Sequence, residues 1–186
     1  MFRHPRGIFY SVTFSPDGHS LVSGSEDGFV GIWNVRDGSC KKLSVTSHVV
    51  SVVFSPDGRY IGAGDLSYSL WIWDSRTHKV IANWGGHENF VWCVKFTPDG
   101  KGLMSGSSDG AVKYWDVSSL GSHEAVSGKG LLTRGNSFPL IRTFHGHTVC
   151  CIFFLLRWLT TFTSTGAHSL YCVFSWQHSM GYYRFR

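Results

Sequence analysis

The sequence predicts an all-β fold made of repeated four-stranded antiparallel units. Apolar runs of about six residues alternate with short turns rich in Gly, Pro, Asp and Ser, which is typical of strands joined by hairpins. The motif Val-x-Phe-Ser/Thr-Pro-Asp-Gly occurs three times at spacings of 40 and 42 residues, ending at Gly18, Gly58 and Gly100. A tryptophan followed by Asn or Asp recurs at the same two spacings, at Trp33, Trp73 and Trp115. This period indicates three copies of one structural unit.

The third unit, residues 86–116, is the most complete copy. Its first run, residues 91–96, alternates apolar side chains, and two further runs follow before the unit ends. In the turn at 97–100, Pro presets φ at a central position, while Asp and Gly supply a side-chain acceptor and tolerance of a positive φ. The pair Asp109-Gly110 is a strong hairpin signal. We therefore expect three antiparallel strands here, joined by two hairpins.

The first two units depart from this copy. Pro5 and Val45 stand where the third unit has His87. The second unit reads Asp-Leu-Ser-Tyr, ending at Tyr68, where the other two have Ser-x-Asp-Gly. Since a tyrosine with φ above zero would be strained, we expect a different turn there and no hydrogen-bond network of the third unit's kind. Linking strands are expected at about 40–44, 79–84 and 140–144.

The pattern ends after the third unit. Residues 119–139 are rich in Ser and Gly and are expected to form a long, flexible surface loop. Gly146-His147 restarts the repeat, but residues 148–186 contain no Ser-Pro-Asp-Gly turn, no Trp-Asp pair and no acidic residue. We interpret this stretch as a tail of a different kind, arising either from a truncated or misread gene model or from genuine divergence.

Composition and charge narrow the classes of function. The N-terminus lacks an apolar signal-peptide region, and no run of about 18 apolar residues could span a membrane. Five cysteines, an odd number, indicate reduced thiols in an intracellular protein that is not secreted. The formal net charge is +5, but all 12 acidic residues lie at or before Glu124, so the basic excess belongs to the C-terminal third. We therefore expect neither a membrane partner nor direct binding to nucleic acid.

The Gly-His and Trp-Asp signatures, repeated at this period, resemble the WD40 repeat family. The resemblance implies a partial β-propeller of about three four-stranded blades plus a diverged fourth segment. The repeats would occupy about residues 3–43, 44–84 and 85–118, giving a repeat region at 1–118, the loop at 119–139, and the restart and tail at 140–186. Because propellers typically close with about 4–8 blades, we expect a fragment of a larger propeller whose open blade edges can self-associate.

The same resemblance implies a polar network in the third repeat. Its members would be His87, Ser105 (or Ser107), Asp109 and Trp115, hydrogen-bonded in series. A His, a Ser and an Asp also make up catalytic triads. This spacing, however, matches the structural network of the repeat, and the sequence has no nucleophile elbow or phosphate-binding loop. We therefore expect no enzymatic activity, no catalytic residue and no cofactor.

A metal site is the other chemical possibility. Two histidines and two cysteines cluster after the loop, at His145, His147, Cys150 and Cys151. Adjacent cysteines on a strand point to opposite faces, and no second pair has the spacing of zinc ligands. We expect no metal to bind.

Protein binding is the class of function that remains. In WD40 propellers, partners often dock on the face formed by the loops before the first strands and by the turns between second and third strands. The matching positions, with their neighbour Phe90, are Tyr10, Glu26, Val50, Leu66, Phe90, Trp92 and Ser108. Trp92 beside Phe90 has the chemistry of an interface anchor. Packing of Trp92 against an adjacent blade is the alternative, and the sequence favours neither.

Longer segments suggest a particular kind of relative. The stretches SVVFSPDGRYIGAG and GHENFVWCVKFTPDGKGLMSGSSDGAVKYWD, and the long Ser/Gly insertion before LIRTFHGH, resemble the C-terminal propeller of the Tup-type fungal general transcriptional corepressors. This resemblance implies a nuclear interaction scaffold that binds peptide segments and DNA-binding repressor proteins. The alternative is a WD40 adaptor in another complex, serving ubiquitin ligation, trafficking or RNA processing.

Overall fold

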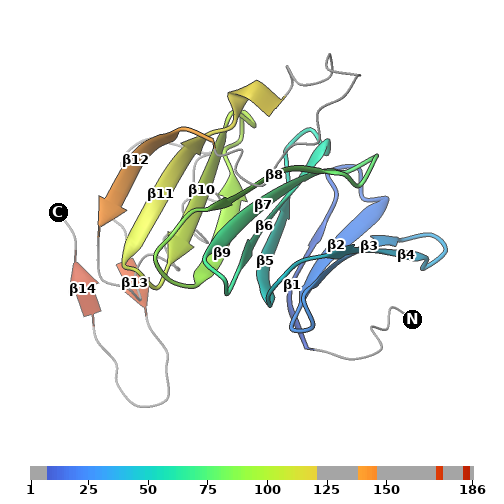
Figure 1. Cartoon of the computed structure of the whole chain (residues 1–186), viewed down its shortest axis with the longest axis horizontal. Helices are drawn as coiled ribbons and strands as arrows, with labels where there is room; N and C mark the ends of the chain where they lie inside the picture. The colour runs from blue at the N-terminus through green and yellow to red at the C-terminus, as the bar shows by residue number, and fades with distance from the viewer. Residues whose placement is uncertain (1–7, 121–137, 146–170, 174–181, 185–186) are drawn as a thin grey trace.

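The computed structural model describes residues 8–120, 138–145, 171–173 and 182–184. These residues contain three four-stranded antiparallel sheets, which stand side by side in sequence order (Figure 1). We call the sheets blades 1, 2 and 3. The innermost strands of neighbouring blades lie against each other, so the blades fan out from a common inner edge. The predicted all-β fold of repeated four-stranded units is confirmed.

Each blade pairs its strands in the order of the sequence. Blade 1 contains β1 (Phe9–Phe14), β2 (Ser20–Ser25), β3 (Phe29–Asn34) and β4 (Cys40–Ser44). Blade 2 contains β5 (Val49–Phe54), β6 (Tyr60–Asp65), β7 (Ser69–Asp74) and β8 (Val80–Gly85). Blade 3 contains β9 (Val91–Phe96), β10 (Gly102–Ser107), β11 (Ala111–Asp116) and β12 (Leu140–His145). A further pair, β13 (Tyr171–Val173) and β14 (Tyr182–Arg184), forms a separate two-stranded sheet.

The turn between the first and second strands of each blade has the chemistry that the sequence predicts. In blade 1, Ser15 Oγ donates a hydrogen bond to Asp17 Oδ1 at 2.5 Å, and Gly18 N–H donates to Ser15 O at 2.9 Å. The fourth turn residue is a glycine with positive φ in every blade, at 71°, 73° and 69° for Gly18, Gly58 and Gly100. Glycine reaches this region without the steric cost of a Cβ. The turn therefore fixes the register of each first hairpin.

The second turn of blade 2 corrects one expectation. Tyr68 adopts a φ of 67°, close to the 78° and 80° of the matching glycines in the other blades, so the expected change of turn is wrong. The physical reason is Asp65, which is fully buried at the end of β6. Its Oδ1 accepts hydrogen bonds from Ser67 N–H and Ser67 Oγ–H, both at 2.8 Å, and from Ser69 N–H at 3.0 Å. These bonds hold the turn against the strain of a tyrosine in the left-handed region.

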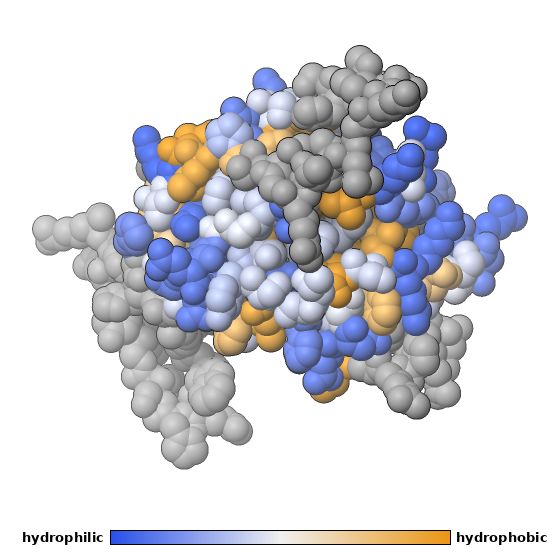
Figure 2. Space-filling view, viewed as in Figure 1, coloured by the Kyte–Doolittle hydropathy of each residue, from blue (hydrophilic) through white to orange (hydrophobic). Residues whose placement is uncertain are grey.

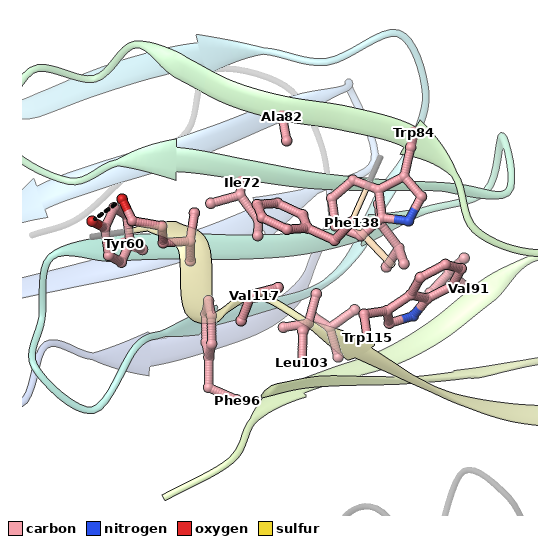
Figure 3. Close-up of a cluster of buried hydrophobic side chains, with 13 residues drawn as sticks. Tyr60, Ile72, Ala82, Trp84, Val91, Phe96, Leu103, Trp115, Val117 and Phe138 are labelled. Carbon is pink, nitrogen blue, oxygen red and sulfur yellow. Dashed lines mark hydrogen bonds between the residues drawn. The ribbon is translucent and has the colours of Figure 1, made fainter. Parts of the chain in front are cut away.

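Apolar cores fill the two interfaces between blades. The core between blades 1 and 2 consists of Val22, Val30, Leu43, Val49, Val52, Phe54, Ile61, Ala63 and Trp73. In the core between blades 2 and 3, Trp84 of β8 lies across from Trp115 of β11 with Phe138 nearby (Figure 3). The ring centroid of Trp84 lies 5.6 Å from that of Trp115 and 5.3 Å from that of Phe138, and both pairs are arranged edge to face. Each blade therefore buries apolar side chains against its neighbour, and this contact adds to the stability of both.

Glycine and serine set the spacing of the blades. A Cβ at Gly24 would lie 2.7 Å from Val49 O, and a Cβ at Gly64 would lie 2.6 Å from Val91 Cγ1. Only a residue without a side chain therefore lets the next blade approach so closely. Ser51 Oγ also accepts a hydrogen bond from Val94 N–H of the next blade at 3.1 Å. This packing brings the loops before β5 and β9 to the same end of the molecule as the second turns.

Two sequence-based expectations fall mainly on residues that the structure does not describe. Residues 121–137 of the expected loop lie outside the described part, as does most of the expected tail. The linking strand expected at 140–144 is β12, which pairs with β11. Within the described ranges, no helix is long and apolar enough to cross a membrane.

Candidate functional site

Four polar side chains of blade 3 form one chain of hydrogen bonds. His87 Nδ1 lies 2.8 Å from Asp109 Oδ2, and His87 Nε2 lies 2.7 Å from Ser105 Oγ. Trp115 Nε1 donates to the same Ser105 Oγ at 2.9 Å. The carboxylate can only accept, so Nδ1 carries the proton, Nε2 accepts from the serine hydroxyl, and that hydroxyl oxygen accepts from the indole. Every donor in this series therefore has an acceptor.

The network uses Ser105 and not Ser107. Ser107 Oγ instead donates to Asn89 O at 3.0 Å and accepts from Asp109 N–H at 3.1 Å. Ser107 thereby ties the loop before β9 to the second turn of the blade. The two serines thus hold the loop before β9 at different places, because Ser105 joins His87 to Trp115 of β11 and Ser107 joins Asn89 to the second turn.

The electrostatics of the network favour a neutral histidine and an anionic aspartate. Burial lowers the pKa of His87 below its usual 6.5, although the hydrogen bond and charge of Asp109 oppose this shift. Burial alone would raise the pKa of Asp109, but hydrogen bonds from the N–H groups of Glu88 and Ala111 and from His87 lower it below 3.8. At neutral pH the pair therefore retains the negative charge of the carboxylate.

Catalysis by this His, Ser and Asp would require a serine hydroxyl that a substrate can reach. Ser105 is fully buried, and its hydroxyl is engaged by both His87 and Trp115. The arrangement therefore supports a structural role. Among the described residues, no group of three His, Cys, Asp or Glu side chains gathers as metal ligands would. Of the His and Cys cluster considered from the sequence, only His145 lies within the described part.

The other two blades carry altered forms of this network. In blade 1, Trp33 Nε1 donates to Ser23 Oγ at 2.8 Å, at the positions that match Trp115 and Ser105. In blade 2, Ala63 replaces the serine and packs with Trp73 in the apolar core. Asp65 instead accepts from the neighbouring Trp71 Nε1 at 2.8 Å. Blade 2 thus replaces the histidine-based network with a network around a buried carboxylate.

The seven residues expected on the binding face differ in how much surface they offer. Tyr10 is 45% exposed, and Phe90 and Trp92 are each 38% exposed. Glu26, Leu66 and Ser108 are half-buried. Val50 is only 8% exposed, because β5 lies between β1 and β9, so its side chain offers almost no surface to a partner. Apolar patches interrupt the hydrophilic surface on the side of the molecule that Figure 2 shows.

Three aromatic side chains form an exposed cluster at the junction of blades 2 and 3. The ring centroids of Phe90 and Trp92 are 6.1 Å apart with an interplanar angle of 86°, and those of Tyr68 and Phe90 are 5.8 Å apart with an angle of 44°. Trp92 Nε1 donates a hydrogen bond to Ser108 Oγ, which fixes the indole ring. We call Tyr68, Phe90 and Trp92 the aromatic cluster.

Backbone hydrogen bonds hold the aromatic cluster in place. Gly86 N–H and His87 N–H both donate to Tyr68 O, at 3.0 and 3.3 Å. Ser108 N–H donates to Phe90 O at 3.0 Å. Tyr68 was absent from the residues expected on the binding face. The available signal was a large aromatic residue at a turn position that favours glycine, which the sequence analysis treated only as a source of strain.

Comparison with known proteins places the chain in a family. The family described as WD domain, G-beta repeat matches residues 1–34, 38–74 and 78–116. The guanine nucleotide-binding protein subunit beta of Nicotiana tabacum is 33% identical over 120 residues, which cover 59% of this chain and 32% of that protein. The WD repeat-containing protein 3 homolog of Dictyostelium discoideum is 29% identical over 119 residues, covering 64% of this chain and 12% of that protein.

Solved structures show the same fold. The RRP9 WD40 repeats align with a TM-score of 0.65 at 24% identity, covering 78% of this chain and 41% of that chain. The structure of U3-55K aligns with a TM-score of 0.66, also at 24% identity. The chain spans about a third of the length of the plant relatives that it matches, which are 32% and 34% covered. With three matched repeats over more than half of its length, the chain belongs to the WD40 repeat family.

Proposed function

We propose that this chain is a protein-interaction scaffold whose binding surface is centred on the aromatic cluster. The observation that carries the proposal is the exposure of Tyr68, Phe90 and Trp92 on a framework that fixes the Trp92 ring and the backbone at the other two residues. Rigid aromatic side chains bind partners well because they add apolar contact at little cost in side-chain entropy. Tyr10, Glu26, Leu66 and Ser108 would extend this surface toward blade 1.

The scaffold we propose is of the transcriptional corepressor type. The support comes from the sequence, namely the segments around the second and third repeats and the long insertion between β11 and β12, which resemble Tup-type corepressors. On this proposal the partners are DNA-binding repressor proteins, and the chain acts in the nucleus. It contacts nucleic acid only through those proteins.

An adaptor in another complex is the second candidate. The observation that favours it is the similarity to plant guanine nucleotide-binding protein beta subunits, at 31–33% identity over 120–133 residues. On this proposal the same face binds a partner that has no connection with transcription.

Self-association is a further part of the proposal. The inner strand of blade 1 exposes Val12 and Phe14, each at 60% of its surface. Apolar sheet faces of this kind favour association. A second copy of the chain, or a further blade, would cover them.

The test is a pull-down with the full chain as bait, from separate nuclear and cytoplasmic extracts. We expect the wild-type chain to retain nuclear DNA-binding proteins, and we expect Trp92→Ala with Phe90→Ala to lose most of them. Val35→Ala is the matched control, because Val35 is equally exposed at 38% but follows β3 at the opposite end of blade 1.

The outcomes separate the candidates. Recovery of cytoplasmic partners alone would contradict the corepressor role and support the adaptor. Unchanged recovery by the double variant, with the same fold as the wild type, would contradict the proposed binding face in either case.

A further inference from the structure

The two ends of the blades differ in charge. The end that carries the aromatic cluster is formed by loops 26–28, 45–48, 66–68, 86–90 and 108–110. Its charged side chains are all acidic, namely Glu26, Asp27, Glu88 and Asp109. The loops of the opposite end also contain acidic residues, but they carry cations beside them, namely Arg36, Arg59, Arg76, Lys79 and Lys101. In the described part of the chain, the aromatic cluster therefore lies at an end that is uniformly negative.

One lysine lies close to this end but does not neutralise it. Lys113 begins on β11 and its Nζ donates to Gly86 O at 2.9 Å, behind the loop that carries the aromatic cluster. Burial lowers the pKa of His87, which keeps this imidazole neutral at neutral pH. The described residues of these loops thus include acidic side chains but no lysine or arginine.

One acidic charge is fixed next to the aromatic cluster. Glu88 N–H donates to Asp109 Oδ2 at 3.0 Å, which places the Glu88 backbone beside the Asp109 carboxylate. Asp109 directly follows Ser108, the residue that holds the Trp92 indole. Glu88 precedes Phe90 by two residues and is exposed. The Asp109 carboxylate therefore lies beside this loop, and the exposed residue Glu88 is part of it.

Phe90 and Trp92 present π faces and no free side-chain hydrogen-bond donor. The N–H of Trp92 is already used by Ser108, and Phe90 has no polar atom. The two rings are almost perpendicular, so a group that lies over the face of one ring meets the edge or face of the other. Aromatic faces attract cations, and tryptophan does so most strongly. An anionic ligand would meet the negative faces of these rings and the acidic residues Glu88 and Asp109, and among the described loop residues of this end it would find no lysine or arginine.

We propose that the aromatic cluster binds a basic segment of a partner protein, with a lysine or arginine side chain held over Phe90 and Trp92 and its charge balanced by Glu88 and Asp109. This inference rests on the proposed function and names the chemistry of its partner. Tyr68 closes one side of the site through its contact with Phe90.

Binding of short peptides to the full chain, measured by fluorescence anisotropy, tests this inference. The probes are three peptides that differ at one central position, which is lysine, acetyl-lysine or phosphoserine. We expect the lysine peptide to bind about fivefold more tightly than the acetyl-lysine peptide, and we expect added salt to weaken it. The phosphoserine peptide should bind more weakly than both.

Variants separate cation binding from simple apolar contact. Trp92→Leu keeps an apolar side chain but removes the π face, so it should abolish the preference for lysine, whereas Trp92→Phe should keep most of it. Glu88→Gln should reduce lysine binding and its salt dependence. Asp37→Asn is the matched control, since it removes one negative charge from an exposed position near the opposite end and should change nothing.

Several results would overturn the inference. These are equal affinity for lysine and acetyl-lysine, tighter binding of the phosphoserine peptide, a preference for lysine that survives Trp92→Leu, or no binding of any peptide. The proposed function would survive each of them if the pull-down still depended on Phe90 and Trp92. The inference and the proposed function can therefore fail separately.

Discussion

Blades 1, 2 and 3 carry nearly the same residues at the ends of their first strands, yet the burial of those residues differs sharply. Val12 and Phe14 of blade 1 are each 60% exposed. Their counterparts are 3% and 8% exposed in blade 2 (Val52 and Phe54), and 0% and 4% in blade 3 (Val94 and Phe96). Each of these pairs lies on the face that meets the preceding blade, and no preceding blade covers blade 1 among the described residues. In this fold, these side chains are therefore buried by the preceding blade.

The largest predicted effect follows from this difference in burial. The same substitution should change the free energy of unfolding far more in blade 3 than at the equivalent position of blade 1. Phe96→Ala should lower the free energy of unfolding by about 3–5 kcal/mol, because it removes a buried ring and leaves a cavity between blades 2 and 3. Phe14→Ala should cost no more than about 0.5 kcal/mol, because the ring is already largely in water. Chemical denaturation of both variants measures the difference.

The same experiment can contradict the comparison. If Phe14→Ala destabilised the chain as much as Phe96→Ala, the first face would have to be covered in solution. Repeating the titration at several protein concentrations would then show whether a second copy supplies the cover, because stability gained from association rises with concentration.

The polar networks of blades 1 and 3 predict a second, smaller difference in the free energy of unfolding. Ser105→Ala should cost about 1–3 kcal/mol, since it removes the partner of both His87 Nε2 and Trp115 Nε1 in the interior. Ser23→Ala in blade 1 removes the acceptor of one indole N–H and should cost less. Blade 2 already has alanine at this position. Denaturation curves of the two variants test the order, and equal losses would show that His87 contributes nothing to the network's stability.

These contrasts also show what the sequence could and could not predict. The three-fold repeat of turn and tryptophan motifs predicted three four-stranded sheets, because glycine turns and alternating apolar strands are local in origin. The expectation of a different turn at Tyr68 was wrong. Local propensity argues against a positive φ there, and the tertiary burial of Asp65 provides the hydrogen bonds that override it.

The candidate site was harder to predict for the same reason. Trp92 and Phe90 could be placed at the binding face from their positions in the repeat. Val50 occupies the position equivalent to Trp92 but is buried, because a blade flanks it on both sides and its side chain is short. Tyr68 joins the aromatic cluster through a contact between two blades, which the pattern within one repeat does not encode.

The titration of His87 in blade 3 gives a third prediction, in which the free energy of unfolding depends on pH. The folded-state pKa of His87 lies below the 6.5 of an unfolded chain, so the unfolded state takes up the proton first as the pH falls. The stabilising contribution is fully present well above pH 6.5 and is lost as the pH falls through 6.5 toward the lower folded-state pKa. We expect the free energy of unfolding to fall between about pH 7.5 and pH 5.

His87→Gln isolates this contribution. The variant should be less stable than the wild type near pH 7.5, and the difference between them should shrink on acidification. His78 also has a lowered pKa, caused by its burial, but it remains in both proteins and cancels in the difference. Parallel stability curves for the two proteins would show that His87 does not titrate differently in the folded state.

The smallest predicted effect concerns the second turn of blade 2. Tyr68 stands where blades 1 and 3 have glycine, and a non-glycine residue in this region costs about 1–2 kcal/mol. Tyr68→Gly should therefore stabilise the chain, although the greater freedom of glycine in the unfolded chain and the lost contact with Phe90 reduce the gain to about 0.5 kcal/mol. The same variant should weaken partner binding, because it removes one ring of the aromatic cluster. Greater stability with weaker binding would mean that the strained tyrosine is retained for binding, whereas lower stability would mean that the contact between Tyr68 and Phe90 holds blades 2 and 3 together.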